Sequence, residues 1–128
     1  MANIKIISNN PMAAEKYPEI SILYNTSVEG IFIHCRNVIH KGASLINHPL
    51  SGSVKPNVSP YKSLVVSSEK SVVDFDSLSL IENAIETLKK LGVRNISNYN
   101  ESTTCDFQVI DLDLLNSAMK ALPPEFYY

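Results

Sequence analysis

The residues best suited to chemistry gather in one stretch of the chain that contains no acid. Between Gly30 and Ser68 there is no aspartate or glutamate, yet this stretch holds all three histidines and four of the eleven lysines and arginines. In its middle, residues 48–62 combine cations, hydroxyls, one glycine and three prolines. Lysines and main-chain amides without a competing carboxylate are suited to hold an anion. We therefore expect a small anionic ligand to bind this 48–62 loop.

The candidate ligand-binding residues of the 48–62 loop are the polar and cationic ones, together with its glycine. They are His48, Ser51, Gly52, Ser53, Lys55, Asn57, Tyr61 and Lys62. The two lysines would hold the negative charge, and the glycine lets the main chain approach a ligand closely. The three prolines limit the conformations of the loop. The alternative interpretation is a solvated connection that carries two ordinary surface lysines.

His48 is the one candidate for catalysis, as an acid or base, because the unperturbed pKa of histidine is near neutral. The alternative is a histidine that caps a strand or faces water. Ser51 and Ser53 lack the Gly-x-Ser-x-Gly pattern of an activated serine, and no Gly-x-x-x-x-Gly-Lys-Ser/Thr phosphate loop occurs. Neither Cys-x-x-Cys nor His-Glu-x-x-His is present. The sequence thus predicts no metal and no cofactor, and it does not decide whether the protein is an enzyme.

Length and charge limit the number of domains and the classes of partner. A chain of 128 residues predicts a single domain over residues 1–128. The net charge is −2, although residues 1–70 hold seven lysines and arginines against four acids. This balance does not favour nucleic acid or a membrane as a partner, and no apolar run approaches the roughly 20 residues that span a bilayer. Two cysteines fit a reducing, cytoplasmic location. The sequence is also compatible with a homodimer.

The spacing of apolar residues predicts strands that alternate with helices. We expect strands near residues 4–7, 20–23, 45–46, 64–66, 93–96 and 107–110. The expected helices cover residues 11–17, 28–41, 78–91 and 114–122, with the second one capped by Thr26 in a Thr-Ser-Val-Glu capping box. Asp111 or Asp113 is expected to start the last helix, after a polar loop at 97–105. Residues 123–128 are expected to form a tail.

This alternation predicts an α/β domain with a mostly parallel sheet of about five strands and helices packed on it, a Rossmann-like three-layer arrangement. Ligands of such sheets bind at the carboxyl ends of the strands. The 48–62 loop follows an expected strand directly, so we expect it to lie at that edge.

Several segments of the chain resemble the GrdX family. They are the opening Ile-Ile-Ser-Asn-Asn-Pro at 6–11, the Ile-His-Lys-Gly at 39–42, the His-Pro-Leu-Ser-Gly-Ser-Val-Lys-Pro-Asn at 48–57 and the Pro-Tyr-Lys-Ser at 60–63. The resemblance runs from about residue 4 to residue 91 and is strongest in the 48–62 loop. Proteins of this family accompany the glycine, sarcosine and betaine reductase system of amino-acid-fermenting anaerobes.

The resemblance implies an accessory role in amino-acid (glycine) reductase metabolism and supplies no catalytic residues. Combined with the loop, it leads us to expect an accessory protein that binds a small anionic ligand through residues 48–62. One alternative is a protein-interaction or assembly module for glycine reductase components. Another is a small enzyme that uses His48 as an acid or base.

Overall fold

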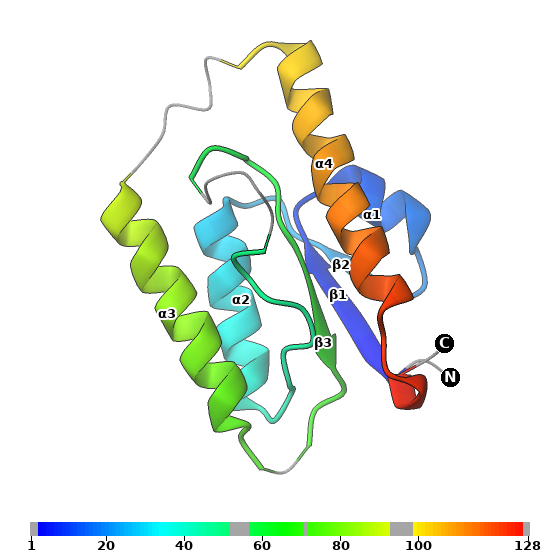
Figure 1. Ribbon diagram of the computed structural model, residues 1–128, viewed down its shortest axis with the longest axis vertical. Helices are drawn as coiled ribbons and strands as arrows, with labels where there is room; N and C mark the ends of the chain where they lie inside the picture. The colour runs from blue at the N-terminus through cyan, green and yellow to red at the C-terminus, as the bar shows by residue number, and fades with distance from the viewer. Residues whose placement is uncertain (1–2, 52–56, 71, 93–98, 127–128) are drawn as a thin grey trace.

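The computed structural model describes residues 3–51, 57–70, 72–92 and 99–126 (Figure 1). The elements follow the chain in the order β1 (Ile4–Ser8), α1 (Pro11–Lys16), β2 (Ser21–Leu23), α2 (Val28–His40), β3 (Ser63–Ser67), α3 (Phe75–Leu91), α4 (Glu101–Lys120) and a short 3-10 helix, η2 (Pro124–Phe126). The expected tail after residue 122 thus begins with η2 in the part that is described.

The sheet has three strands in the order β2-β1-β3. β2 runs parallel to β1, with Ile7 opposite Ile22. β3 runs antiparallel to β1, with Ser63 opposite Ser8 and Ser67 opposite Ile4. The beginning of β3 therefore lies beside the carboxyl ends of β1 and β2, and we call this edge of the sheet its carboxyl edge.

The protein is α/β, but the prediction of a mostly parallel five-stranded Rossmann-like sheet is wrong, because the sheet is three-stranded and mixed. Of the expected extra strands, residues 45–46 form only an isolated bridge between Leu45 and Val66. Residues 107–110 are helical. The expected strand at 93–96 lies outside the described residues. The long connection before β3 lets the chain reverse direction, and apolar periodicity carries no information about strand direction.

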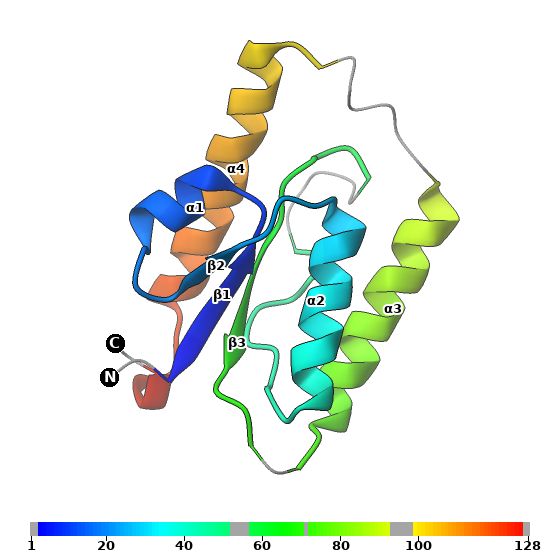
Figure 2. The same cartoon turned by 180° about the vertical axis from the view of Figure 1, so that it is seen from behind.

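Helices cover both faces of the sheet (Figures 1 and 2). Ile7, Leu64 and Val66 face α2 and α3, and they pack with Phe32 and Ile81 in one buried cluster. Strand side chains alternate between faces, so the neighbouring positions of β1 and β3 point to the other side. There a second buried cluster joins the sheet to α1 and α4, and its members are Ile4, Ile6, Ala13, Ile20, Val65, Leu115, Met119 and Leu122.

The last helix differs most from expectation. α4 begins at Glu101, so the expected loop at 97–105 and strand at 107–110 are wrong over the described residues. Asn100 caps the helix, with its side-chain oxygen accepting a hydrogen bond from the Thr103 amide at 2.8 Å. The β-branched and aromatic residues at 107–110 favour a strand locally, but this preference is weak and the cap and tertiary packing override it.

Polar side chains also set the beginnings of the other helices. Ser27, not Thr26, caps α2 by accepting a hydrogen bond from the Gly30 amide at 3.1 Å. Asp74 caps α3 by accepting a hydrogen bond from the Asp76 amide. Asn10 caps α1, with Pro11 at the first helical position. Caps of this kind satisfy amides that have no partner inside the helix, so they fix where each helix starts.

Candidate functional site

The segment that leads into the 48–62 loop lies along the outer side of β3. The Ile46 amide donates a hydrogen bond to the Val65 carbonyl at 2.8 Å. The Asn47 side chain accepts from the Val65 amide at 2.8 Å and donates to the Ser63 carbonyl at 3.2 Å. These contacts carry the chain back toward the beginning of β3. They place His48 at the carboxyl edge of the sheet.

Residues 48–51 then form a tight turn, which we call the 48–51 turn. The Ser51 amide donates a hydrogen bond to the His48 carbonyl at 3.2 Å. His48 Nδ1 accepts a hydrogen bond from the Leu50 amide at 3.1 Å. A neutral imidazole that accepts at Nδ1 carries its proton on Nε2, so the exposed His48 ring has a donor available for a ligand.

Lys62 brings a positive charge to this turn from the other end of the loop. Its ammonium donates to the Ser51 carbonyl at 3.3 Å, and its amide donates to Asn9 Oδ1 at 2.9 Å. Asn9 holds the main chain further through bonds from Nδ2 to the Thr26 and Pro60 carbonyls, both at 2.8 Å. Burial lowers the pKa of Lys62, and the negative charge of Asp111 opposes that shift. Lys62, Ser51 and His48 are thus brought together, and we call this group the Lys62 site.

Two other candidate residues are occupied by structural contacts. The Tyr61 hydroxyl accepts a hydrogen bond from Gln108 Nε2 of α4 at 2.9 Å. Asn57 Nδ2 donates to the Leu91 and Gly92 carbonyls at the end of α3, at 3.3 and 3.4 Å. Tyr61 therefore ties the loop to α4, and Asn57 ties it to α3. The remaining candidates, Gly52, Ser53 and Lys55, lie outside the described residues.

A buried acid beside the Lys62 site was not among the sequence candidates. Asp111 of α4 accepts hydrogen bonds at Oδ2 from Ser63 Oγ at 2.6 Å and from Asn10 Nδ2 at 3.0 Å. Ser8 Oγ lies 2.8 Å from Ser63 Oγ and accepts from the Asn10 amide at 2.9 Å. These four residues, all buried, form what we call the Asp111 network at the carboxyl edge.

Burial raises the pKa of Asp111, while the bonds from Ser63 and Asn10 and the positive charge of Lys62 act in the opposite direction. Desolvation disfavours the charged form of a carboxyl group, and donors or a nearby cation favour it. The expected role of Asp111 as a helix cap is wrong, because it lies inside α4. Its spacing of four and eight from the buried Leu115 and Met119 is the signal that could have placed it on the inner face.

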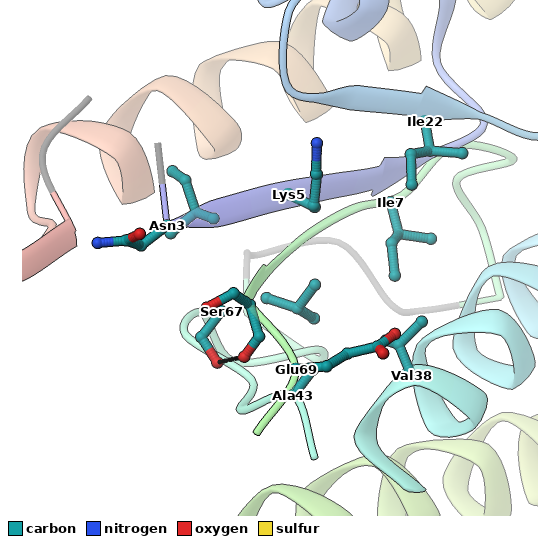
Figure 3. A pocket seen from close by; sticks show the side chains of 11 residues that line it. Asn3, Lys5, Ile7, Ile22, Val38, Ala43, Ser67 and Glu69 are labelled. Atoms are coloured by element: carbon teal, nitrogen blue, oxygen red, sulfur yellow. Dashed lines mark hydrogen bonds between the residues drawn. The ribbon is translucent and has the colours of Figure 1, made fainter. Parts of the chain in front are cut away.

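A pocket of about 320 Å³ opens at the opposite end of the sheet (Figure 3). Its walls are largely apolar and include Ile7, Ile22 and Val38, while the Glu69 carboxylate extends toward Val38. Lys5 lies on the β1 side. None of the candidate residues of the 48–62 loop lines this pocket. It is therefore separate from the Lys62 site.

Within the residues that the structure describes, no helix is long and apolar enough to cross a membrane. Over those same residues, no group of three His, Cys, Asp or Glu side chains is placed to hold a metal ion. Cys35 is buried in the α2 core, and burial raises the pKa of its thiol to about 12. A thiol in that state is inert at neutral pH.

Comparison with known proteins identifies the family. A family model described as GrdX-like protein matches residues 5–120, which is most of the chain. The chain belongs to the GrdX-like family. The match includes the whole 48–62 loop and also α4 down to its last residue, so it reaches further than the resemblance in the first two thirds of the sequence. No curated protein and no solved structure matches the chain.

Membership of the GrdX-like family associates the chain with glycine reductase systems, as an accessory protein. The resemblance to GrdX proteins that the sequence motifs indicate is thus confirmed. Both the Lys62 site and the Asp111 network lie within the matched residues. Together they place one ammonium, one carboxylate and one imidazole at the carboxyl edge of this GrdX-like domain.

Proposed function

We propose that this GrdX-like protein serves glycine reductase metabolism by binding a small anionic ligand at the Lys62 site. The observation that carries the proposal is the hydrogen bonding of the Lys62 ammonium. It has one hydrogen-bond acceptor among the described residues, the Ser51 carbonyl, although an ammonium has three donors. Partial burial lowers its pKa, although its bond to Ser51 is exposed to solvent. An anion at this position would supply further acceptors and the opposite charge.

The neighbouring groups support the same ligand chemistry. His48 has an Nε2–H donor available at the 48–51 turn, and Ser51, whose carbonyl Lys62 contacts, carries a hydroxyl that could also bind an anion. Lys55 remains a second cation of the proposal by its place in the loop sequence. A desolvated lysine gains more from an anion than a fully hydrated one does, because less bound water has to be displaced.

The test measures anion binding by isothermal titration calorimetry and by thermal unfolding. Acetate and inorganic phosphate serve as probes, with Lys62→Met as the variant and Lys120→Met, on the exposed end of α4, as the matched control. We expect a bound anion to stabilise the wild type by about 2.7 kcal/mol at 100 times its Kd. Lys62→Met should lose this stabilisation, and Lys62→Ala combined with Lys55→Ala should abolish binding. Equal binding by wild type and Lys62→Met would refute the proposal.

A second candidate function is a protein-interaction module for glycine reductase components. The exposed side of α4 favours it, because Val109, Ile110 and Leu114 are 45, 40 and 37% exposed on a single helix. Apolar side chains that gather on a surface often mark a contact with another protein. A purified reductase component that binds the wild type and Lys62→Met equally, but not Ile110→Lys, would favour this function.

An enzyme that uses His48 as acid or base receives no such support, since no described carboxylate orients the ring.

A further inference from the structure

The Asp111 network and the Lys62 site are adjacent but do not neutralise each other. Ser63, whose hydroxyl binds the Asp111 carboxylate, directly follows Lys62 in the chain. The two charges are close enough to influence each other, but no ion pair forms between them. A carboxylate and an ammonium therefore share one edge of the sheet without direct contact.

The two charges have different hydrogen-bond partners. Asp111 Oδ2 accepts from the Ser63 hydroxyl and from Asn10 Nδ2, and the main chain of Ser63 also favours the charged form of this carboxyl group. Among the described residues, the Lys62 ammonium donates only to the Ser51 carbonyl. Tyr61 and Gln108 pair beside them and hold the loop against α4, so the distance between the charges is set by packed elements.

This arrangement has a consequence for any anion that Lys62 binds. The ligand enters the field of Asp111, which repels negative charge in surroundings where water screens poorly. A doubly charged anion is repelled more than a singly charged one. A ligand that also carries a positive charge escapes this penalty and gains attraction to the carboxylate.

We infer that Asp111 is a specificity-determining residue that makes the Lys62 site select a small zwitterion, an amino acid, over simple carboxylates and phosphate. This inference rests on the proposed anion binding at Lys62. It adds the class of ligand and assigns that choice to a residue of α4, outside the 48–62 loop. The carboxylate of the amino acid pairs with Lys62, and its ammonium is favoured by the charge of Asp111.

The test compares ligands that share a carboxylate and differ in the amino group. Glycine is paired with acetate, and β-alanine with propionate, while phosphate represents a doubly charged anion. For the wild type we expect each amino acid to bind at least about tenfold more tightly than its partner, because the ammonium group of the amino acid is attracted by the charge of Asp111. Phosphate should bind most weakly.

Two variants then assign the preference. Asp111→Asn keeps an acceptor for Ser63 and Asn10 but removes the charge, so the ratio of glycine to acetate affinity should fall toward one and phosphate affinity should rise. Asp113→Asn removes one negative charge from an exposed position of the same helix and should keep the wild-type ratio. Far-ultraviolet circular dichroism verifies that each variant is folded.

The possible outcomes separate the two proposals. If acetate binds the wild type as tightly as glycine, or if Asp111→Asn keeps the ratio, the inference is wrong while anion binding at Lys62 stands. If no probe binds in a way that depends on Lys62, the proposed function itself fails. If Asp111→Asn does not fold, the wild-type ranking of glycine, acetate and phosphate still decides, because equal affinities overturn the inference.

Discussion

Asp111 anchors α4 to the sheet, and in our proposal its charge also acts on a bound ligand. Ser63 and Asn10 donate to it from the sheet and from the start of α1, so one carboxylate connects three elements. Removal of the side chain would take a buried acceptor from Asn10 and Ser63, and a buried donor left unpaired typically costs about 1 to 3 kcal/mol. The network therefore stabilises α4 on the sheet whether or not a ligand is present.

The raised pKa of Asp111 predicts a pH effect on stability. The folded protein holds the carboxyl proton more tightly than the unfolded chain, whose carboxyl keeps the ordinary value of 3.8. The contribution of Asp111 to the free energy of unfolding is therefore full below that value and is lost as the pH rises through the folded pKa. We expect Asp111→Asn to remove this decrease in the free energy of unfolding with rising pH. Urea unfolding at a series of pH values from about 3 to 7 measures it.

Asp74 provides a control, because its pKa is shifted in the direction opposite to that of Asp111. The Ser77 hydroxyl lowers the pKa of this cap residue, so its contribution to stability is present above the ordinary value and is lost as the pH falls through the folded pKa. Asp74→Asn should therefore remove a rise in stability with pH. If both variants changed the pH profile in the same direction, the assignment of Asp111 would be wrong.

The sequence pattern predicts Lys62, His48 and Ser51 as ligand-binding candidates but does not predict Asp111. A stretch without acids draws attention to residues that are neighbours in the chain. Asp111 reaches Ser63 across a separation of 48 residues. Local composition therefore predicts the positive groups of the proposed site, while Asp111 is brought beside them only by the packing of α4 on the sheet.

At the scale of elements, the 48–62 loop is fixed at its far end by Asn57. Its side-chain amide binds the two last carbonyls at the end of α3, which have no partner within the helix. We expect Asn57→Ala to lower the free energy of unfolding by about 1 kcal/mol, the usual net value of a hydrogen bond. Chemical denaturation measures the change. Asn83→Ala, at an exposed position of α3, should leave stability nearly unchanged, and an equal loss in both variants would contradict this role.

The chain leaves α2 through Gly42, which lies very close to the main chain of Lys70. Gly42 has a φ of +105°, and a Cβ atom there would collide with the Lys70 carbonyl. Gly92 at the end of α3 also has a positive φ, of +79°, but no described atom crowds its Cβ position. Both alanine variants bear the cost of a positive φ, about 1 to 2 kcal/mol. Gly42→Ala should lose about 1 to 3 kcal/mol more through overpacking. Thermal unfolding of the two variants isolates that difference.

The elements with strong apolar periodicity were predicted well from the sequence. The first strand, α2 and α3 appear within a few residues of expectation, since each buries a continuous apolar face. The prediction of residues 107–110 as a strand was wrong because their local preference conflicts with the helix that Asn100 caps. The half of α4 that holds Asp111 and Gln108 was thereby lost from the expected site.

At the scale of the whole molecule, a small sheet is stabilised by two separate cores. The cluster on the α1 and α4 side depends on few side chains, with Leu115 buried in its centre. We expect Leu115→Ala to cost about 2 to 5 kcal/mol through lost contacts and a cavity. The neighbouring Leu114 is 37% exposed and serves as a matched control, for which we expect less than about 1 kcal/mol. Equal costs in urea unfolding would show that α4 does not pack as described.

The α/β class follows from the alternation of apolar segments, but the sheet order does not. Strand direction depends on contacts between distant residues such as Ser8 and Ser63, which periodicity does not encode. The antiparallel β3 nevertheless starts beside the carboxyl ends of the parallel pair. For this reason the 48–62 loop reaches the edge of the sheet where a ligand was expected, although the strand order assumed for that argument was wrong.

The bond between Asn10 and Asp111 spans 101 residues. During translation Asn10 and Lys62 leave the ribosome long before Asp111. A nascent chain therefore has the lysine of the proposed site but not yet the carboxylate. An amino acid that requires both charges would thus bind only after α4 has been synthesised and has docked. Ligand recognition would then distinguish the finished protein from its incomplete precursors.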